Sequence, residues 1–240
     1  MDEKYYTISY AESPFGTLNQ YMTRTFVWMF AGLLVTFAVG IGTLSSPLFY
    51  GILFNSGLYL LLCIAELVMV VVLSARIEKL RPSTATTLFF GYAVLNGINL
   101  SVIFAAYAFS TLVLAFLVGA VYFGIMALYG SRTQKDLSSW GSMLSGALIT
   151  LIIVGLLGGL LMFFVPGAFG MFDLILCAVS LVVFMAFTAY DVQKLKYYYS
   201  YFGGNAAMLH KSSIIGALSL YLDYINIFLY VLRILGRHRD

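Results

Sequence analysis

The sequence predicts an all-α integral membrane protein, a bundle of seven transmembrane helices with no sizeable soluble domain. Of the 240 residues, 62% are hydrophobic and only 10% are charged, whereas soluble domains are about 25% charged. The mean hydropathy is +0.96, and the stretches 25–65 and 82–131 carry no charge at all. The chain has too few polar side chains to cover a surface that faces water, and we therefore expect its surface to face lipid.

Seven apolar segments are long enough to span a bilayer. A helix needs about 20 apolar residues to cross the hydrocarbon core, and only a helix satisfies its own backbone groups there without a partner strand. Ser45-Ser46-Pro47 separates the first two segments, and Pro166-Gly167 ends the fifth. The predicted spans are 26–44, 57–76, 86–107, 111–129, 142–165, 172–195 and 214–235.

The basic residues predict the orientation of these spans, because cytoplasmic loops are enriched in Lys and Arg. If the first six spans cross, one side of the membrane holds Lys4, Arg24, Arg76, Lys79, Arg81, Arg132, Lys135, Lys194, Lys196 and Lys211. The opposite connections contain no Lys or Arg. We therefore expect a cytoplasmic amino-terminal tail 1–24, a transmembrane domain 25–236 and a short carboxyl-terminal tail 237–240.

The last span is the exception to this charge pattern. Arg233, Arg237 and Arg239 would lie outside if it crosses, and inside if it enters and returns. Its length of about 20 residues favours a full crossing, and that is the expectation here. The net charge of +3 is small, and the basic residues do not cluster with aromatic ones, so no nucleic-acid partner is expected.

Ionisable side chains within the apolar segments are few, and such groups in a membrane usually have a function or a charged partner. Glu66 falls in the second span, Asp191 near the end of the sixth and Asp223 near the middle of the seventh. At about 1.5 Å per residue, Asp191 and Asp223 reach similar depths below the cytoplasmic surface. Arg76 ends the second span in the same layer, so these charges form a candidate site.

The seventh span carries a polar stripe at steps of three and four residues, which places its members on one helix face. The stripe consists of Gly216, Ser219, Asp223, Asn226, Tyr230 and Arg233. Thr188 precedes Asp191 by one turn in the sixth span. We therefore expect an ion path lined by Glu66, Asn226, Ser219 and Thr188.

Structural alternatives stay open for each of these residues. The stripe could serve inter-helical hydrogen bonding, and Asp191 could be an interfacial charge that reaches the headgroups. Glu66 could be a protonated structural carboxyl, and Arg76 could be an anchor of the kind that marks cytoplasmic helix ends.

Two carboxylates in close contact do not titrate independently, and they tend to share one proton. Our hypothesis is that Asp191 and Asp223 form such a pair, which latches the last two spans in one protonation state and releases them in the other. Carboxylates without thiolates or imidazoles also suit a hard cation such as Ca²⁺, so both are candidates for a transient Ca²⁺ contact.

Two stretches resemble the Bax inhibitor-1 family, also called the transmembrane Bax-inhibitor-motif family. They are FTAYDVQKL at 187–195 and LSLYLDYINIFLYVLRILG at 218–236, the second being close to the family's last-helix signature. The stretch GYAVLNGINLSVIFAAY at 91–107 resembles the family's third span more loosely. Span number and chain length fit as well, so the resemblance covers essentially the whole chain.

The resemblance implies six helices around a central seventh and a pH-sensitive calcium leak. It implies that Asp191 and Asp223 are the proton sensor with Arg76 as partner, although the second span has no motif that fixes the register of Arg76. The short chain resembles bacterial members, which sit in the plasma membrane. No cofactor is implied beyond Ca²⁺ as the permeating ion. A monomer is expected, and no protein partner is identified.

Other classes of function remain as alternatives. A proton-coupled solute transporter would use the same carboxylates, and a non-transporting interaction protein could modulate a membrane protease or a stress response. Intramembrane aspartyl proteases also pair two aspartates, but their second one lies in a Gly-x-Gly-Asp turn, whereas Ser-Leu-Tyr-Leu precedes Asp223. His210 and His238 lie outside the predicted spans without a partner pattern. We therefore expect no enzyme.

Overall fold

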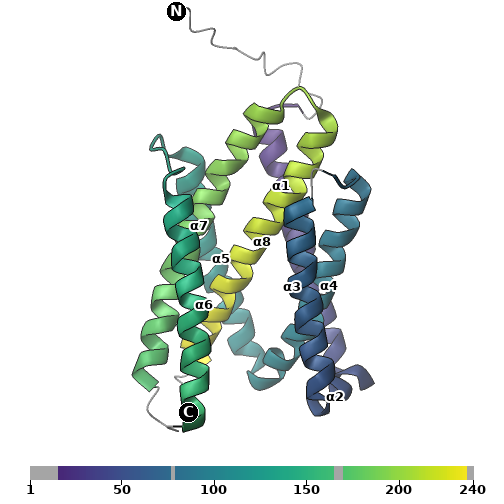
Figure 1. The fold of residues 1–240 in the computed structure, drawn as a ribbon, viewed down its shortest axis with the longest axis vertical. Helices are drawn as coiled ribbons and strands as arrows, with labels where there is room; N and C mark the ends of the chain where they lie inside the picture. The colour runs from purple at the N-terminus through teal and green to yellow at the C-terminus, as the bar shows by residue number, and fades with distance from the viewer. Residues whose placement is uncertain (1–15, 77–78, 165–169, 237–240) are drawn as a thin grey trace, which may run out of the picture. The chain divides into compact units, whose positions relative to one another are not determined.

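Eight helices and no strand make up the part of the chain described by the computed structural model, residues 16–76, 79–164 and 170–236 (Figure 1). The predicted tail 237–240 and most of the predicted tail 1–24 lie outside these ranges. In chain order the helices are α1 (Leu18–Leu44), α2 (Pro47–Phe54), α3 (Ser56–Arg76), α4 (Pro82–Ala106), α5 (Phe109–Arg132), α6 (Trp140–Phe164), α7 (Gly170–Phe202) and α8 (Ala206–Gly236).

All seven predicted spans correspond to a helix, but two helices begin well before the apolar residues do. α1 begins at Leu18, eight residues ahead of the predicted span, because Thr17 and Gln20 form a capping box that satisfies the first backbone N–H groups. The last helix likewise begins eight residues before the predicted span at 214–235. The Asn205 side chain accepts a hydrogen bond from the Met208 N–H at 3.0 Å, so α8 begins at Ala206 and includes His210.

Polar residues in the first two turns of α8 are buried with partners on α1, which explains why the helix extends there. The Tyr21 hydroxyl lies 2.9 Å from Ser212 Oγ, and Thr25 Oγ1 lies 2.9 Å from Ser213 Oγ. The short helix α2 is a further difference, because the sequence predicted only a connection there. Pro47 occupies its first turn, where the missing N–H has no helical partner to lose.

The described residues form two compact units, and α7 and α8 each contribute to both. Unit 1 comprises residues up to 106 together with 194–221, and unit 2 comprises 107–193 together with the residues from 222 onward. In unit 1, α4 packs against both α1 and α3. The α1–α4 contact is close, since a Cβ on Gly97 would lie 2.6 Å from the Thr36 carbonyl oxygen.

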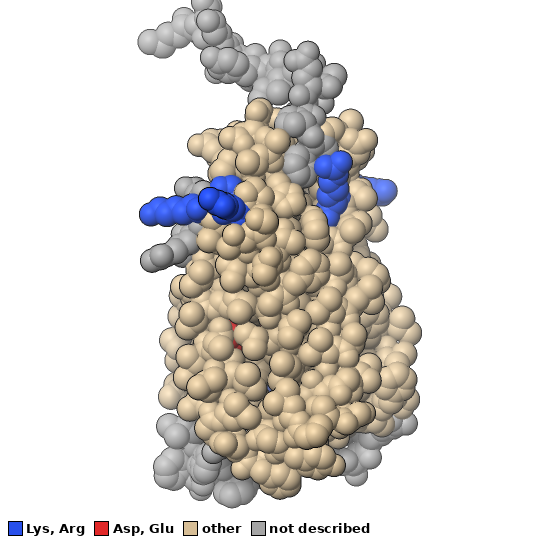
Figure 2. Space-filling model, turned by 90° about the vertical axis from the view of Figure 1, so that its right-hand side faces the viewer, with Lys and Arg blue, Asp and Glu red and all other residues tan. Residues whose placement is uncertain are grey.

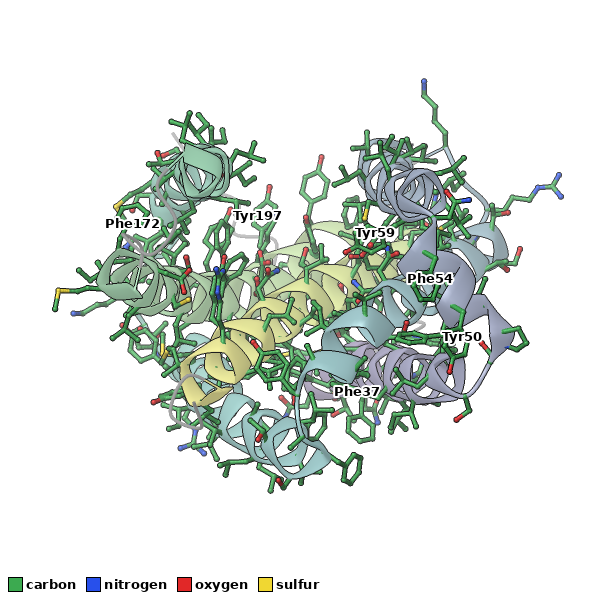
Figure 3. All side chains as sticks on the ribbon, turned by 90° about the horizontal axis from the view of Figure 1, so that it is seen from below. Phe37, Tyr50, Phe54, Tyr59, Phe172 and Tyr197 are labelled. Carbon is green, nitrogen blue, oxygen red and sulfur yellow. The ribbon has the colours of Figure 1, made fainter. Side chains whose placement is uncertain are left out.

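The helices expose the apolar surface of a multi-pass membrane protein. Six of them are long and apolar enough to cross a bilayer, and the described apolar stretch of α3, Gly57–Leu73, is shorter. On the face shown in Figure 2, Lys and Arg side chains gather toward one end, and the broad band below them shows almost no charged side chains. Large apolar side chains are also exposed, among them Tyr50 and Phe54 of α2 and Phe172 of α7 (Figure 3).

An aromatic cluster lies on the last turns of α7. The Tyr197 ring stacks on the Tyr201 ring at 5.8 Å between centroids, and Tyr201 meets Phe202 edge-on at 4.8 Å. Tyr197 and Tyr201 are 62% and 69% exposed. Exposed tyrosines at the end of a membrane helix are typical of the interface between lipid and water.

Candidate functional site

In unit 2 the polar stripe of α8 faces α7. The Tyr230 ring stacks on the Phe184 ring at 6.0 Å between centroids, and Arg233 pairs with Asp173 at 2.5 Å. These contacts join residues early in α7 to residues late in α8, so the two helices run antiparallel. The stripe therefore serves the α7–α8 interface over this part of its length.

The Phe184–Tyr230 contact sets a register that brings Asp191 and Asp223 to the same level. Asp191 follows Phe184 by seven residues, and Asp223 precedes Tyr230 by seven, which is about 10 Å along each antiparallel helix. Asp191 is the charged neighbour that acts electrostatically on Asp223. Asp223 is 4% exposed, and its Oδ2 atom is buried without a hydrogen-bond partner among the described residues. Asp191 is half-buried.

Three contacts hold the turn of α7 that carries Asp191. A Cβ on Gly130 of α5 would collide with the Ala189 carbonyl, and one on Gly141 of α6 would lie 2.6 Å from the Tyr190 hydroxyl. Gln193 accepts a hydrogen bond from the Leu137 N–H at 2.7 Å and donates one to the Lys135 carbonyl at 2.8 Å. Two helices and a loop thereby fix the height of Asp191.

The α8 turn beside Asp223 is held just as closely by α5. The Tyr224 hydroxyl donates to the Phe116 carbonyl at 3.0 Å, and its ring meets Phe116 and Phe123 edge-on. A Cβ on Gly119 would lie 3.5 Å from Cα of Phe228. The carboxyl of Asp223 thus projects from a rigidly packed helix, not from a loop.

The remaining predicted path residues are divided between the two units. Thr188 is buried and donates to the Phe184 carbonyl at 3.0 Å, and Asn226 donates to the Leu222 carbonyl at 2.8 Å. Both belong to unit 2, whereas Ser219 belongs to unit 1 and is half-buried. Arg76 is the last residue of α3, and its side chain lies outside the part that the structure describes.

Glu66 forms a separate polar cluster in unit 1. Its carboxylate accepts hydrogen bonds from Asn96 Nδ2 at 2.7 Å and from Asn99 Nδ2 at 2.5 Å. Asn96 Nδ2 also donates to the Tyr92 hydroxyl at 3.1 Å. The Oδ1 atoms of both asparagines are buried without a partner among the described residues. Each oxygen of the Glu66 carboxyl thus has one amide donor from α4.

Several positioning residues were not predicted from the sequence. Gly130, Gly141 and Gln193 hold the Asp191 turn, and Asp173 pairs with Arg233. The spacing of Asn96 and Asn99, one turn apart, could have indicated a shared partner. Within the described residues, no group of three or more His, Cys, Asp or Glu side chains could hold a metal ion.

The fold and this site define a multi-pass α-helical membrane protein in which a buried carboxyl on the last helix faces an acidic neighbour on the helix before it. The chain belongs to the Bax inhibitor-1 family, as its sequence predicted. The family model described as "Inhibitor of apoptosis-promoting Bax1" matches residues 18–240.

Bacterial relatives match over nearly the whole chain. The inner membrane protein YbhL of Escherichia coli K12 is 40% identical, covering 94% of this chain and 95% of YbhL. Protein RP147 of Rickettsia prowazekii is 35% identical over 93% of this chain and 92% of its own length. A Deinococcus radiodurans protein is 36% identical over 93% and 94%.

Proposed function

We propose that the protein is a pH-sensitive calcium leak channel of a bacterial plasma membrane, gated by a proton shared between Asp191 and Asp223. The observation that carries this proposal is the buried Asp223 carboxyl, whose Oδ2 atom has no hydrogen-bond partner among the described residues and whose charged neighbour is Asp191. Ionising both groups in that setting is costly, whereas one shared proton removes most of the repulsion.

The proton then acts as a latch between α7 and α8. In the protonated state one carboxyl can donate a hydrogen bond to the other, which holds the two helices together. In the ionised state the carboxylates repel each other and attract a cation. Ca²⁺ prefers oxygen ligands, and the two carboxylates supply them. Loss of the proton would therefore open the latch and create a transient binding site for the ion.

The membrane arrangement in this proposal has seven spans, with α3 as the second and α8 at the centre. Of the six candidate spans, α8 has the most buried apolar window, at 67% against 11–50% for the other five. The amino terminus faces the cytoplasm on the positive-inside argument. In this proposal Arg76 is the partner of the latch, and the ion path is lined by Glu66, Ser219, Asn226 and Thr188. The proposed channel has no enzymatic activity and no resident cofactor.

Calcium flux into liposomes tests the proposal. Purified protein is reconstituted around a calcium-sensitive dye, and leak is measured from pH 5 to pH 8. We expect a pH-dependent leak in the wild type that becomes nearly independent of pH in Asp191→Asn and in Asp223→Asn. Asp136→Asn is the matched control, because Asp136 is a fully exposed carboxyl in the loop between α5 and α6.

The outcomes separate this proposal from its rivals. Leak that requires a second solute on the opposite side would favour a proton-coupled transporter. The absence of leak at every pH would favour an interaction protein. If the leak stays pH-dependent in both Asp191→Asn and Asp223→Asn, these two residues are not the proton sensor.

A further inference from the structure

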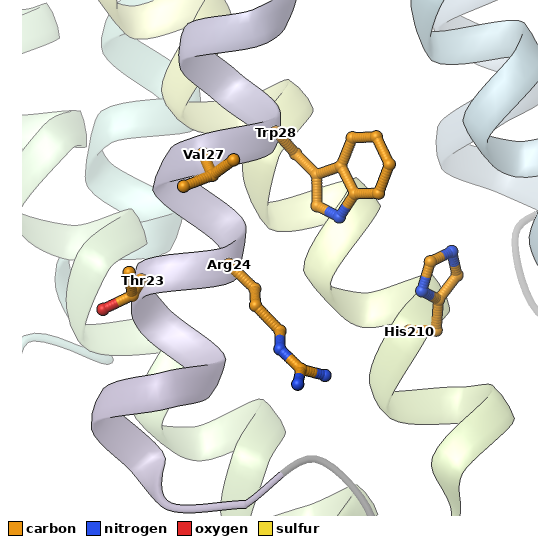
Figure 4. Close-up of a pocket in the computed structure, with 5 residues that line it drawn as sticks. All are labelled: Thr23, Arg24, Val27, Trp28 and His210. Carbon is orange, nitrogen blue, oxygen red and sulfur yellow. The ribbon is translucent and has the colours of Figure 1, made fainter.

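A pocket of about 380 Å³ lies in unit 1 between the start of α1 and the start of α8. Thr23, Arg24, Val27 and Trp28 of α1 and His210 of α8 line it. Arg24, Trp28 and His210 extend into the same space from the two helices (Figure 4). None of these residues belongs to the proposed gate, so the pocket requires an explanation of its own.

One side of the pocket offers the chemistry of an anion site. The Arg24 guanidinium and the His210 imidazole line the same space. A guanidinium binds phosphate oxygens with two parallel hydrogen bonds, and an imidazole offers a further polar contact to an anion.

The ring of His210 is held in place by its neighbours. Thr86 Oγ1 lies 3.3 Å from His210 Nε2, and the Trp28 ring meets the imidazole edge-on at 6.1 Å between centroids. Trp28 is itself packed against Phe90 of α4 at 5.9 Å. Three helices of unit 1 therefore preorganise the pocket, which lowers the entropy that a ligand must lose on binding.

The other side of the pocket continues into an exposed apolar stripe on α1. Val27 lines the pocket and is 60% exposed, and Phe30 and Leu34 follow at steps of three and four residues with 52% and 55% exposure. This stripe offers an acyl chain a path along the helix, starting at the polar groups. A tryptophan at the junction is typical of the headgroup level of a membrane.

We propose that this pocket binds the headgroup of one anionic phospholipid, with the phosphate between Arg24 and His210 and an acyl chain along Val27, Phe30 and Leu34. Basic pockets between membrane helices bind anionic headgroups in this way. A soluble phosphate would match the polar side only and would leave the apolar stripe unused. The proposal is independent of the gate in unit 2.

Trp28 provides a direct measurement, because the chain has only two tryptophans. Trp140→Phe leaves Trp28 as the single tryptophan of the full-length protein, which can be excited selectively at wavelengths where tyrosine does not absorb. This protein is reconstituted into phosphatidylcholine vesicles that contain increasing fractions of phosphatidylglycerol with brominated chains, and quenching is compared with that by brominated phosphatidylcholine. We expect phosphatidylglycerol to be preferred about fivefold, the factor that roughly one basic residue contributes at an anionic surface.

Three variants in the Trp140→Phe background locate the preference. Arg24→Gln should reduce the quenching by phosphatidylglycerol to the phosphatidylcholine value, and His210→Gln should weaken the preference. Arg132→Gln is the matched control, because Arg132 is also an exposed arginine at a helix end, and it should keep the full preference. Trp28 emission in pure phosphatidylcholine reports whether each variant is folded around the pocket.

Four results would overturn the proposal. The first is equal quenching of Trp28 by the two lipids in the parent protein. The second and third are a phosphatidylglycerol preference that persists in Arg24→Gln, and a loss of that preference in Arg132→Gln as large as in Arg24→Gln. The fourth is reversal of the quenching by inorganic phosphate at millimolar concentration. The last result would identify a site for a soluble anion.

Discussion

The Arg233 guanidinium of α8 contacts the Asp173 carboxylate of α7 at 2.5 Å. Arg233 is the described member of the three basic residues that contradict the positive-inside pattern if the last helix crosses. The ion pair places Arg233 beside the start of α7. The pair also fixes the end of the α7–α8 interface at which the polar stripe finishes.

The contribution of this ion pair to stability should be small but measurable. The Arg233 side chain is 50% exposed and that of Asp173 15%, and pairs of this kind contribute about 0.2–1 kcal/mol. A double-mutant cycle with Asp173→Asn and Arg233→Gln, followed by thermal unfolding in detergent, should give a coupling of this size. Strict additivity of the two single changes would show that the pair is not formed in solution.

Enlarging Gly130 should disturb the gate from a distance. A methyl group there collides with the carbonyl of Ala189, two residues before Asp191, so we expect Gly130→Ala to destabilise the protein by about 1–3 kcal/mol. It should also shift the pH midpoint of calcium leak. Gly124→Ala in the same helix is the matched control, since a Cβ there meets no atom within 4 Å. Equal effects of the two substitutions would argue against the close α5–α7 contact.

The hydrogen bonds of Glu66 can be tested through Asn99. Asn99→Ala removes the donor to Glu66 Oε2 and should destabilise the protein by about 1–3 kcal/mol. Asn99→Asp should be more destabilising, because it replaces this donor with a second carboxyl beside the first. Thermal unfolding in detergent near neutral pH compares the two variants. Better tolerance of Asn99→Asp than of Asn99→Ala would contradict the role of Asn99 as a donor to Glu66.

Asp136 should not contribute to the pH response near neutrality. Hydrogen bonds from the backbone N–H and the hydroxyl of Ser138 lower the pKa of the exposed Asp136 carboxyl. A lowered pKa in the folded protein gives a stabilising effect that is present above the ordinary pKa and is lost only as the pH falls through the folded value. The flux profile of Asp136→Asn should therefore match the wild type from pH 5 to pH 8. A displaced midpoint would show that this loop takes part in gating.

The sequence predicted the seven long helices but not α2, because membrane spans depend on long apolar stretches, which are read directly from composition. It did not predict the start of α8, because the two polar turns before Ile214 are stabilised by Tyr21 and Thr25, some 190 residues away in the chain. The Asn205 cap was visible in the sequence, after Gly203 and Gly204, and could have corrected this boundary.

The candidate site was predictable in part. Charged residues within apolar stretches are conspicuous, so Glu66, Asp191 and Asp223 could be selected without a structure. Their neighbours are not conspicuous, because Gly130 and Gln193 are ordinary residues whose importance comes only from the helices that cross there. The roles proposed for Asp191, Asp223 and Arg76 stay predictions until flux is measured.

The aromatic end of α7 has a mechanical consequence. The helix has 33 residues, which gives it a length of about 50 Å, and the hydrocarbon core is about 30 Å thick. With Tyr197 and Tyr201 anchored at the water boundary, hydrophobic mismatch in a thinner or thicker bilayer is accommodated by tilting this helix. Since α7 also carries Asp191, bilayer thickness should act on the same helix as the proposed proton gate.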